Sequence, residues 1–209
     1  CKNKPENYFI PYNCPPVWSS FISSTGDILI DSRSLNQVGN TKFTFMSKNP
    51  NKLELLGNQK TLGMLFFNPS LRTRLSFYIA IKQLGADSIT VKASELHIGK
   101  GGESIADTAK ILSTYGDGFM FRTNSDKKVE NFKKYLSIPL INGLSPSSHP
   151  TQVLSDIFTV EEIKKKSISK LNICWIGDSN NVLNSLIAAA VKFSFKLSVG
   201  CPKKFEPKK

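Results

Sequence analysis

The sequence predicts an α/β fold: a doubly wound parallel sheet, followed by the start of a second, Rossmann-like α/β domain. Three observations lead to this prediction. From Thr61 onward, short apolar runs alternate with longer segments whose apolar residues recur at helical spacing. Strands that alternate with helices of this length form largely parallel sheets with right-handed crossovers. A turn-rich break, LSPSS (144–148), then precedes a long helix, after which a second sheet can begin.

Each predicted element has a local signal. The run TLGMLFF (61–67) is typical of a buried strand, and RTRLSFYIAIKQLG (72–85) has the apolar spacing of a helix. The segment GESIADTAKILSTYG (102–116) has Glu at its start and Gly at its end, and HPTQVLSDIFTVEEIKKK (149–166) has Pro in its first turn. The remaining strands are predicted at 87–93, 118–121, 138–143, 170–178 and 195–200, and the remaining helices at 125–137 and 180–194.

The same pattern predicts three divisions of the chain. Residues 1–41 have no comparable periodicity and are expected to be an irregular extension of unknown role. Residues 42–150 are expected to form the first α/β domain. Residues 151–209 are expected to hold an interdomain helix and an incomplete second domain.

Composition restricts the classes of partner. The chain has 28 Lys and Arg against 16 Asp and Glu, a net charge of +12. Such an excess suits nucleic acid, an acidic membrane or an anionic small substrate. No basic stripe is interleaved with aromatic residues, so no nucleic-acid partner is expected. No apolar run approaches the roughly 20 residues of a membrane-spanning helix, and no secretion signal opens the chain. The four cysteines show no paired spacing, which favours a reducing, cytoplasmic location.

Arginine is rare, and most of the rare polar residues fall directly after predicted strands. Ligands of open parallel sheets bind outside the carboxyl ends of the strands, so these residues are the candidates for a site. A chain that relies on lysine elsewhere is expected to use arginine where a planar, forked donor is needed. In chain order the candidates are Ser70, Arg72, Thr73, His97, Arg122, His149, Gln152, Asp178, Asn180 and Asn181.

The stretch NPSLRTR (68–74) has the features of an anion site. The first backbone N–H groups of a helix lack internal acceptors and favour a negative charge. Ser70 and Thr73 add hydroxyl donors, and Arg72 adds a bidentate donor for phosphate oxygens. The alternative is an ordinary cap with surface arginines. That alternative suits Arg74 best, since it lies about 200° round the helix from Arg72.

The stretch HPTQ (149–152) suits a carbonyl group. His149 precedes Pro and is held extended, and Gln152 lies one turn further on. A neutral imidazole can donate to a carbonyl oxygen as negative charge develops there, although a capping His fits the tetrapeptide equally well. The turn WIGDSNN lacks the glycines of a dinucleotide site, and HIGKGGES is not a P-loop. No cluster of His, Asp and Glu has metal-ligand spacing, so no cofactor and no metal are expected.

Together these motifs resemble the aspartate/ornithine transcarbamoylase family. FFNPSLRTRLSF is similar to its carbamoyl-phosphate signature, Ser-Thr-Arg-Thr-Arg, with Leu71 in the first Thr place, and HPTQVLSD is similar to its His-Pro-x-Gln segment. The resemblance extends from Lys60 to Pro207. ELHIGKGGES, WIGDSNNVLNSLIAAAVKF and CPKKFEP resemble the ornithine branch. The aspartate branch remains an alternative, but its Gly-Arg-x-x-His-Ser pattern is absent and Gly101 stands where its loop lysine is expected.

The resemblance implies a reaction and a role for each site residue. The chain would transfer the carbamoyl group of carbamoyl phosphate to the δ-amine of ornithine in arginine biosynthesis, without a cofactor, as a homotrimer if intact. Arg72, Arg122 and His149 would be catalytic, and Asn181 would contact ornithine. His97 matches a residue that reaches a neighbouring subunit's site. The carbamoyl-phosphate site would comprise Ser70, Leu71, Arg72, Thr73, Arg122, His149 and Gln152.

The chain also departs from the family pattern. It stops at Lys209, before the later Asp-x-Trp-x-Ser-Met-Gly and His-Cys-Leu-Pro motifs that bind the amino acid. We therefore expect a truncated enzyme that binds carbamoyl phosphate but turns over poorly. The alternatives are a non-catalytic anion-binding remnant and an enzyme that uses N-acylated ornithine as its acceptor, because Leu at position 71 also suits those relatives.

Overall fold

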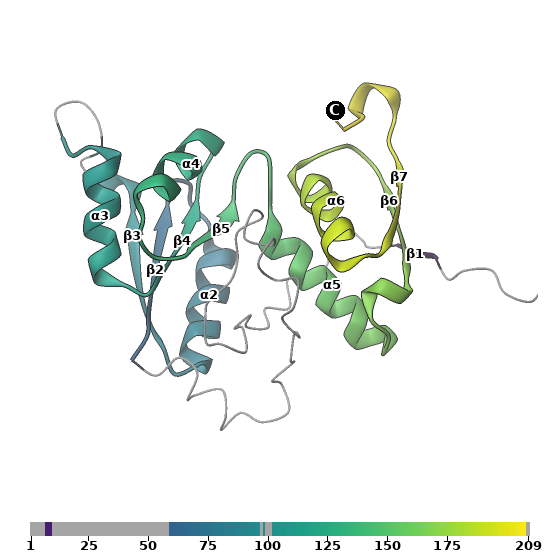
Figure 1. Ribbon diagram of the computed structural model, residues 1–209, viewed down its shortest axis with the longest axis horizontal. Coiled ribbons are helices and arrows are strands. Elements are labelled where there is room, and N and C mark those ends of the chain that lie inside the picture. The colour runs from purple at the N-terminus through teal and green to yellow at the C-terminus, as the bar shows by residue number, and fades with distance from the viewer. Residues whose placement is uncertain (1–6, 10–58, 97, 99–101, 208–209) are drawn as a thin grey trace, which may run out of the picture. The chain divides into compact units, whose positions relative to one another are not determined.

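The computed structural model describes residues 7–9, 59–96, 98 and 102–207 (Figure 1). The described residues fall into two compact units, which we treat separately. The four-stranded unit comprises residues 59–146. The three-stranded unit comprises residues 147–207 together with residues 7–9.

The four-stranded unit has a parallel sheet with the strand order β3-β2-β4-β5. Its strands are β2 (Thr61–Phe66), β3 (Asp87–Lys92), β4 (Gly118–Arg122) and β5 (Leu140–Leu144). Its helices are α2 (Leu71–Gln83), α3 (Ile105–Tyr115) and α4 (Asp126–Tyr135), and a short 3-10 turn, η3 (Ala93–Glu95), follows β3. All of these strands and helices were predicted from the apolar pattern, and the α/β fold class is confirmed.

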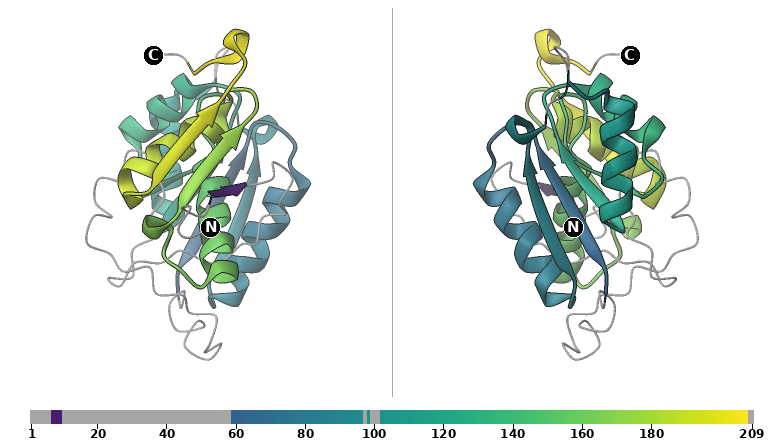
Figure 2. Two further views of the ribbon diagram at one scale, coloured as in Figure 1. Left: turned by 90° about the vertical axis from the view of Figure 1, so that its right-hand side faces the viewer. Right: turned by 90° about the vertical axis from the view of Figure 1, so that its left-hand side faces the viewer.

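Helices cover both faces of this sheet, as the doubly wound prediction requires. On one face, Phe77 and Ile81 of α2 pack against Met64 and Met120 of the sheet. On the other face, a second cluster joins α3 and α4 to side chains that alternate with the first set along β2 and β4. The two views in Figure 2 and the view in Figure 1 agree on this arrangement. The continuous apolar runs of β2 and β4 follow from burial on both faces.

Gly63 of β2 shows how tightly the second face is packed. It pairs with Phe119 of β4, and a Cβ atom placed on Gly63 would lie 2.0 Å from the Phe119 ring. Phe119 is buried. Position 63 therefore requires glycine because a ring occupies the space that any other side chain would need.

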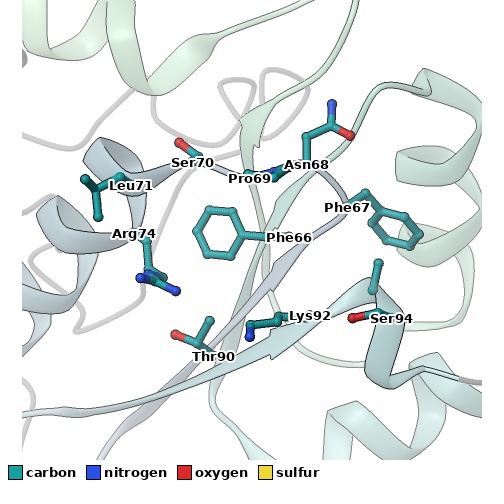
Figure 3. A pocket seen from close by; sticks show the side chains of 11 residues that line it. Phe66, Phe67, Asn68, Pro69, Ser70, Leu71, Arg74, Thr90, Lys92 and Ser94 are labelled. Carbon is teal, nitrogen blue, oxygen red and sulfur yellow. The ribbon is translucent and has the colours of Figure 1, made fainter.

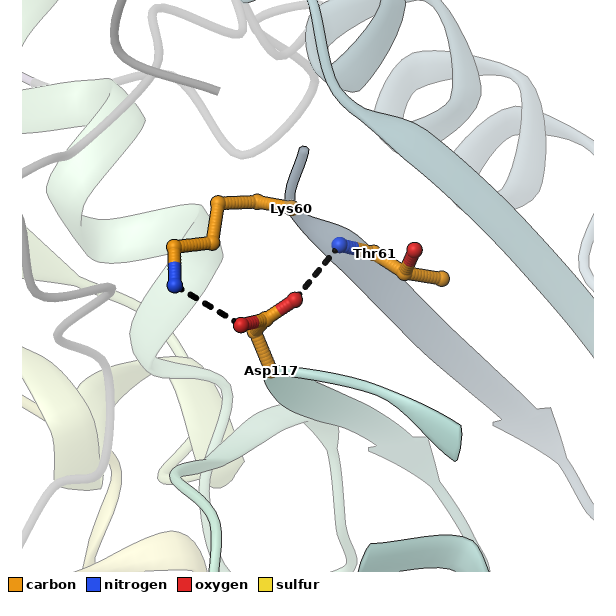
Figure 4. A network of polar contacts seen from close by, with 3 residues as sticks. All are labelled: Lys60, Thr61 and Asp117. Carbon is orange, nitrogen blue, oxygen red and sulfur yellow. Dashed lines mark hydrogen bonds and ion pairs between the residues drawn. The ribbon is translucent and has the colours of Figure 1, made fainter. Parts of the chain in front are cut away.

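Asp117, which precedes β4, forms hydrogen bonds to residues at the start of β2, at the amino-terminal end of the sheet (Figure 4). Its carboxylate accepts a hydrogen bond from Nζ of Lys60 at 2.8 Å and another from the backbone N–H of Thr61 at 2.8 Å. The bond from Lys60 and the bond from Thr61 lower the pKa of Asp117. Both bonds therefore favour the charged form and hold the start of β2 beside the start of β4.

The three-stranded unit contains a second parallel sheet, with the strand order β1-β6-β7. Its elements are β1 (Asn7–Phe9), α5 (Pro150–Lys164), η4 (Ile168–Lys170), β6 (Asn172–Ile176), α6 (Asn181–Phe193), β7 (Lys196–Gly200) and η5 (Lys203–Phe205). Its core joins α5 and α6 to β6 through Val153, Ile157, Ile173 and Leu183. Strand β1 lies in the stretch that was expected to be irregular, whose other residues are outside the described part of the chain.

Candidate functional site

Helix α2 begins at the carboxyl end of β2 with its first N–H groups uncapped. Ser70 is the N-cap residue by position, with extended backbone (φ −155°, ψ 94°), but its side chain accepts no capping hydrogen bond. The first turn of α2 also contains no acidic residue. These N–H groups have no acceptor within the helix, so this end of α2 carries a partial positive charge that neither the Ser70 side chain nor a first-turn acid offsets.

The other described helices differ in how their first turns are capped. The N-cap side chains of α3, α4 and α6 all accept hydrogen bonds from their own first turns, through Ser104, Ser125 and Asn180. Helices α3 and α4 also have an Asp in the first turn. Helices α2 and α5 have neither device, and both begin at residues that were predicted to belong to a site. The Ser70 hydroxyl at the start of α2 is therefore available to a ligand, as are the N–H groups behind it.

Arg122 brings a guanidinium group to this helix end from the last position of β4. Its Nη1 donates to Oγ1 of the buried Thr73 at 2.9 Å, and the strand register pairs Arg122 with Phe66, the last residue of β2. Burial lowers the pKa of Arg122, and its Nε is buried without a partner in the described residues. Such an unsatisfied donor is costly unless an acceptor completes it, and a phosphate oxygen is a suitable acceptor.

A pocket of about 390 Å³ opens beside the same helix start (Figure 3). Ser70 and Leu71 line it together with two basic residues, Arg74 of α2 and Lys92 of β3. Figure 3 shows the Phe66 ring and the side chains of Arg74 and Lys92 around this pocket. No acidic residue lines the pocket, so its potential adds to that of the helix end.

In the three-stranded unit, His149 is placed by the backbone and by α6. It is the N-cap residue of α5, and Pro150 follows at the first helical position. The His149 backbone N–H donates to Oγ of Ser185 at 2.8 Å, and that hydroxyl donates to the carbonyl of Asn181 at 3.1 Å. The His149 Nδ1 lies 3.2 Å from Oγ1 of Thr151. A hydrogen-bond chain therefore joins two predicted site residues, His149 and Asn181.

Gln152 lies in the first turn of α5, and its side-chain amide is held by a residue one turn further along the helix. Its Nε2 donates to Oδ1 of Asp156 at 2.9 Å. Asp156 is 9% exposed, and burial raises its pKa to about 6, while the bond from Gln152 acts in the opposite direction. A carboxyl group with a perturbed pKa next to a predicted ligand-binding amide marks a functional candidate.

The structure thus assembles the predicted residues in two sets. Ser70, Leu71, Arg72 and Thr73 form the first turn of α2, where Arg122 joins them. His149, Gln152 and Asn181 belong to the three-stranded unit. Asn180 serves as a cap, since its Oδ1 accepts from the N–H groups of Val182 and Leu183. His97 lies outside the described residues.

Two contributing residues were missed by the sequence reasoning. Ser185 and Asp156 look like ordinary helix residues, although each lies four positions after a residue that was singled out, Asn181 and Gln152. That spacing places side chains on one face of a helix and could have indicated both. Gly177, at the end of the β6 run, has φ +143°, which explains why the turn of WIGD needs glycine.

Each set of donors suits a different chemical group. The set in the four-stranded unit offers helix N–H groups, hydroxyls and guanidinium groups that suit a phosphate. The set in the three-stranded unit offers an imidazole and an amide that suit a carbonyl. In the described ranges, no three His, Cys, Asp or Glu residues gather closely enough to hold a metal ion. None of the helices described there is long and apolar enough to cross a membrane.

Comparison with known proteins agrees with this chemistry. Residues 30–162 match the carbamoyl-phosphate-binding domain model of the aspartate/ornithine carbamoyltransferases, and residues 169–209 match their aspartate/ornithine-binding domain model. The chain is 47% identical over 148 residues to an ornithine carbamoyltransferase of Syntrophotalea carbinolica, covering 71% of this chain and 48% of the relative. It is 45% identical over 149 residues to one of Anoxybacillus flavithermus, covering 71% and 47%.

Solved structures give the same result. Ornithine carbamoyltransferase from Pyrococcus furiosus superposes with a TM-score of 0.67 at 42% identity, covering 74% of this chain and 49% of that one. The anabolic ornithine carbamoyltransferase of Campylobacter jejuni gives 0.71 at 34% identity, covering 86% and 57%. The chain spans about half the length of the curated relatives it matches.

Proposed function

The chain belongs to the aspartate/ornithine carbamoyltransferase family, and from this premise we propose that it transfers the carbamoyl group of carbamoyl phosphate to the δ-amine of ornithine. The products are citrulline and phosphate, in arginine biosynthesis. The observation that carries the proposal is the uncapped start of α2 beside the unsatisfied guanidinium of Arg122. The names of the relatives support ornithine as the acceptor.

The start of α2 binds the phosphate group in this proposal. The Ser70 and Thr73 hydroxyls and the backbone N–H of Leu71 donate to phosphate oxygens, and the Leu71 side chain takes no part. Arg72 and Arg122 add charge-assisted hydrogen bonds. The backbone N–H groups of α2, and Arg122 through its bond to Thr73, are held in place before the ligand arrives. They can therefore stabilise the charge that grows on the departing phosphate with little reorganisation.

His149 and Gln152 hold the carbamoyl group. We assign the Thr151 hydroxyl as the donor to His149 Nδ1, which leaves the proton of the neutral ring on Nε2. That N–H can donate to the carbonyl oxygen. The uncharged δ-amine then attacks the carbonyl carbon and forms a C–N bond. The tetrahedral intermediate collapses by breaking the C–O bond to phosphate, and the proton lost by the amine passes to the departing phosphate.

Asn181 contacts the amino acid in this proposal, at the first position of α6. His97 serves the site of a neighbouring subunit in a homotrimer. Exposed apolar side chains on α2, at Leu75, Tyr78 and Ile79, offer surface for contacts between subunits. We place the protein in the cytoplasm, where the free thiols found at Cys174 and Cys201 stay reduced.

The test is citrulline formation by the full chain with carbamoyl phosphate and ornithine. Arg72→Ala is the inactivating variant, and Lys110→Ala, which removes an exposed cation of α3 outside the pocket, is the control of equal charge change. Turnover that Arg72→Ala abolishes and Lys110→Ala retains supports the proposal. Carbamoylation of aspartate or N-acetylornithine instead would overturn the assigned acceptor. Ligand binding without turnover would support a non-catalytic carbamoyl-phosphate-binding protein.

A further inference from the structure

Asp156 occupies an environment that is costly for a carboxylate. It lies one turn after Gln152 on α5, is 9% exposed, and has the Gln152 amide as its hydrogen-bond donor. Within the described residues, no Lys, Arg or His forms an ion pair with it. A carboxylate buried without a cation destabilises the fold, whereas Asn could make a similar bond without charge. We therefore expect Asp156 to have a role that depends on its carboxylate and that Asn could not fill.

That property is the ability of an ionised carboxylate to accept hydrogen bonds and its inability to donate them. A glutamine amide has an NH₂ end and an oxygen end, and it can rotate to present either one. Asp156 accepts only from the NH₂ end, at 2.9 Å. The Gln152 amide is thereby held in one orientation, and its Oε1 is left as an acceptor for another partner.

We propose that Asp156 is a positioning residue that fixes the Gln152 amide so that Oε1 accepts from the N–H groups of the carbamoyl ligand. The inference rests on the proposed function, in which Gln152 holds the carbamoyl group. A carbamoyl group differs from an acetyl group of nearly the same shape by its NH₂ donors. An acceptor fixed at this position distinguishes the two, because a buried acceptor left without a donor is penalised.

The arrangement also depends on pH. Burial raises the pKa of Asp156 to about 6, so the carboxyl is protonated below that pH and can itself donate to Oε1. The Gln152 amide can then rotate so that its NH₂ end faces the ligand, and the preference for the carbamoyl NH₂ is lost. The basic groups on the elements packed against α5 are Lys192 of α6 and Lys170 of η4. The start of α5 carries His149, and its last turns carry Glu161, Glu162 and Lys164. None of them is among the causes of the shift, which are burial and the Gln152 bond.

The test compares two ligands that differ only in the group recognised. Phosphonoacetamide carries the carbamoyl NH₂, and acetonylphosphonate has a methyl group in its place. We expect the wild-type chain to prefer the amide about tenfold at pH 8, as one hydrogen bond provides. Asp156→Asn should reduce that preference to about twofold or less while its affinity for acetonylphosphonate stays unchanged. Asp156→Glu, which keeps the carboxylate, should restore part of the preference.

The pH dependence of the affinity ratio distinguishes a role of Asp156 in orienting the Gln152 amide from a role in packing alone. In the wild-type chain the ratio of the two affinities should fall as the pH is lowered through about 6, and in Asp156→Asn it should be flat. Ionisation of the phosphonate cancels from the ratio because both ligands share it. If Asp156→Asn prefers phosphonoacetamide over acetonylphosphonate as strongly as the wild type does, the role of Asp156 is overturned while the proposed function stands. Failure of the wild-type chain to bind either ligand would overturn the proposed function, and the inference with it.

A measurement on the unliganded wild-type chain covers the case in which Asp156→Asn fails to fold. The side-chain NH₂ signals of Gln152, identified by their loss in Gln152→Met, should shift with a midpoint near pH 6 in ¹⁵N-edited NMR spectra. Signals that do not respond to pH in this range would overturn the inference without reference to any ligand.

Discussion

Replacing Asp156 by Asn should stabilise the three-stranded unit at neutral and higher pH. The pKa of Asp156 rises from 3.8 to about 6 on folding, a difference of about two pH units. One unit corresponds to about 1.4 kcal/mol, so ionisation of Asp156 costs the fold about 3 kcal/mol at pH 8. Because the folded-state pKa is raised, the native state binds the extra proton, and the cost grows as the pH rises from 3.8 through about 6. A neutral side chain of the same shape avoids it.

Urea unfolding at several pH values measures this effect. Trp175 lies in the same buried cluster as Val153 and Ile157 of α5, so its fluorescence follows the unit that contains Asp156. A Trp18→Phe background removes the second tryptophan of the chain. Asp156→Asn should be more stable by up to about 3 kcal/mol at pH 8, with the difference narrowing as the pH falls toward 4. A variant no more stable than the wild type at pH 8, or a difference that widens in acid, would refute the reasoning.

Three further outcomes are expected. Asp117→Asn should lower the free energy of unfolding by about 1 kcal/mol at neutral pH, measured by urea titration beside the wild type. Because the pKa of Asp117 is lowered, this loss should vanish only as acid protonates the wild-type carboxylate. Gly63→Ala should lower the free energy of unfolding by roughly 2 kcal/mol or more, since its Cβ would overlap the Phe119 ring. Adding Phe119→Leu to that variant should recover part of the loss, as measured by thermal unfolding. Arg122→Gln should weaken phosphate binding at least about tenfold by calorimetry. Lys110→Gln, which changes the charge equally on the exposed side of α3, is the control, and similar losses in both variants would refute a specific role for Arg122.

The secondary structure could be predicted because each element carries its own signal. β2 and β4 are continuous apolar runs, since both faces of their sheet are buried, and α5 is marked by Pro150 at its first position. β1 could not be predicted, because three residues contain no measurable period and their pairing with β6 depends on residues far along the chain.

The phosphate half of the candidate site was also predictable, because helix starts after parallel strands bind anions for reasons that are local in sequence. What the sequence could not show is that Ser70 leaves its helix uncapped, while Ser104 and Ser125 cap theirs. Nor could it show the bond from His149 to Ser185, which joins residues on two different helical segments. These contacts are tertiary, so no local pattern records them.

The central claim is that the start of α2 binds the phosphate of carbamoyl phosphate, and calorimetric titration of the full chain with phosphonoacetamide tests it most directly. Binding should be saturable, lost in Arg72→Ala and kept in Lys110→Ala, which removes an exposed cation of α3. A folded wild-type chain that shows no binding, or an Arg72→Ala variant that binds as well as the wild type, would contradict it.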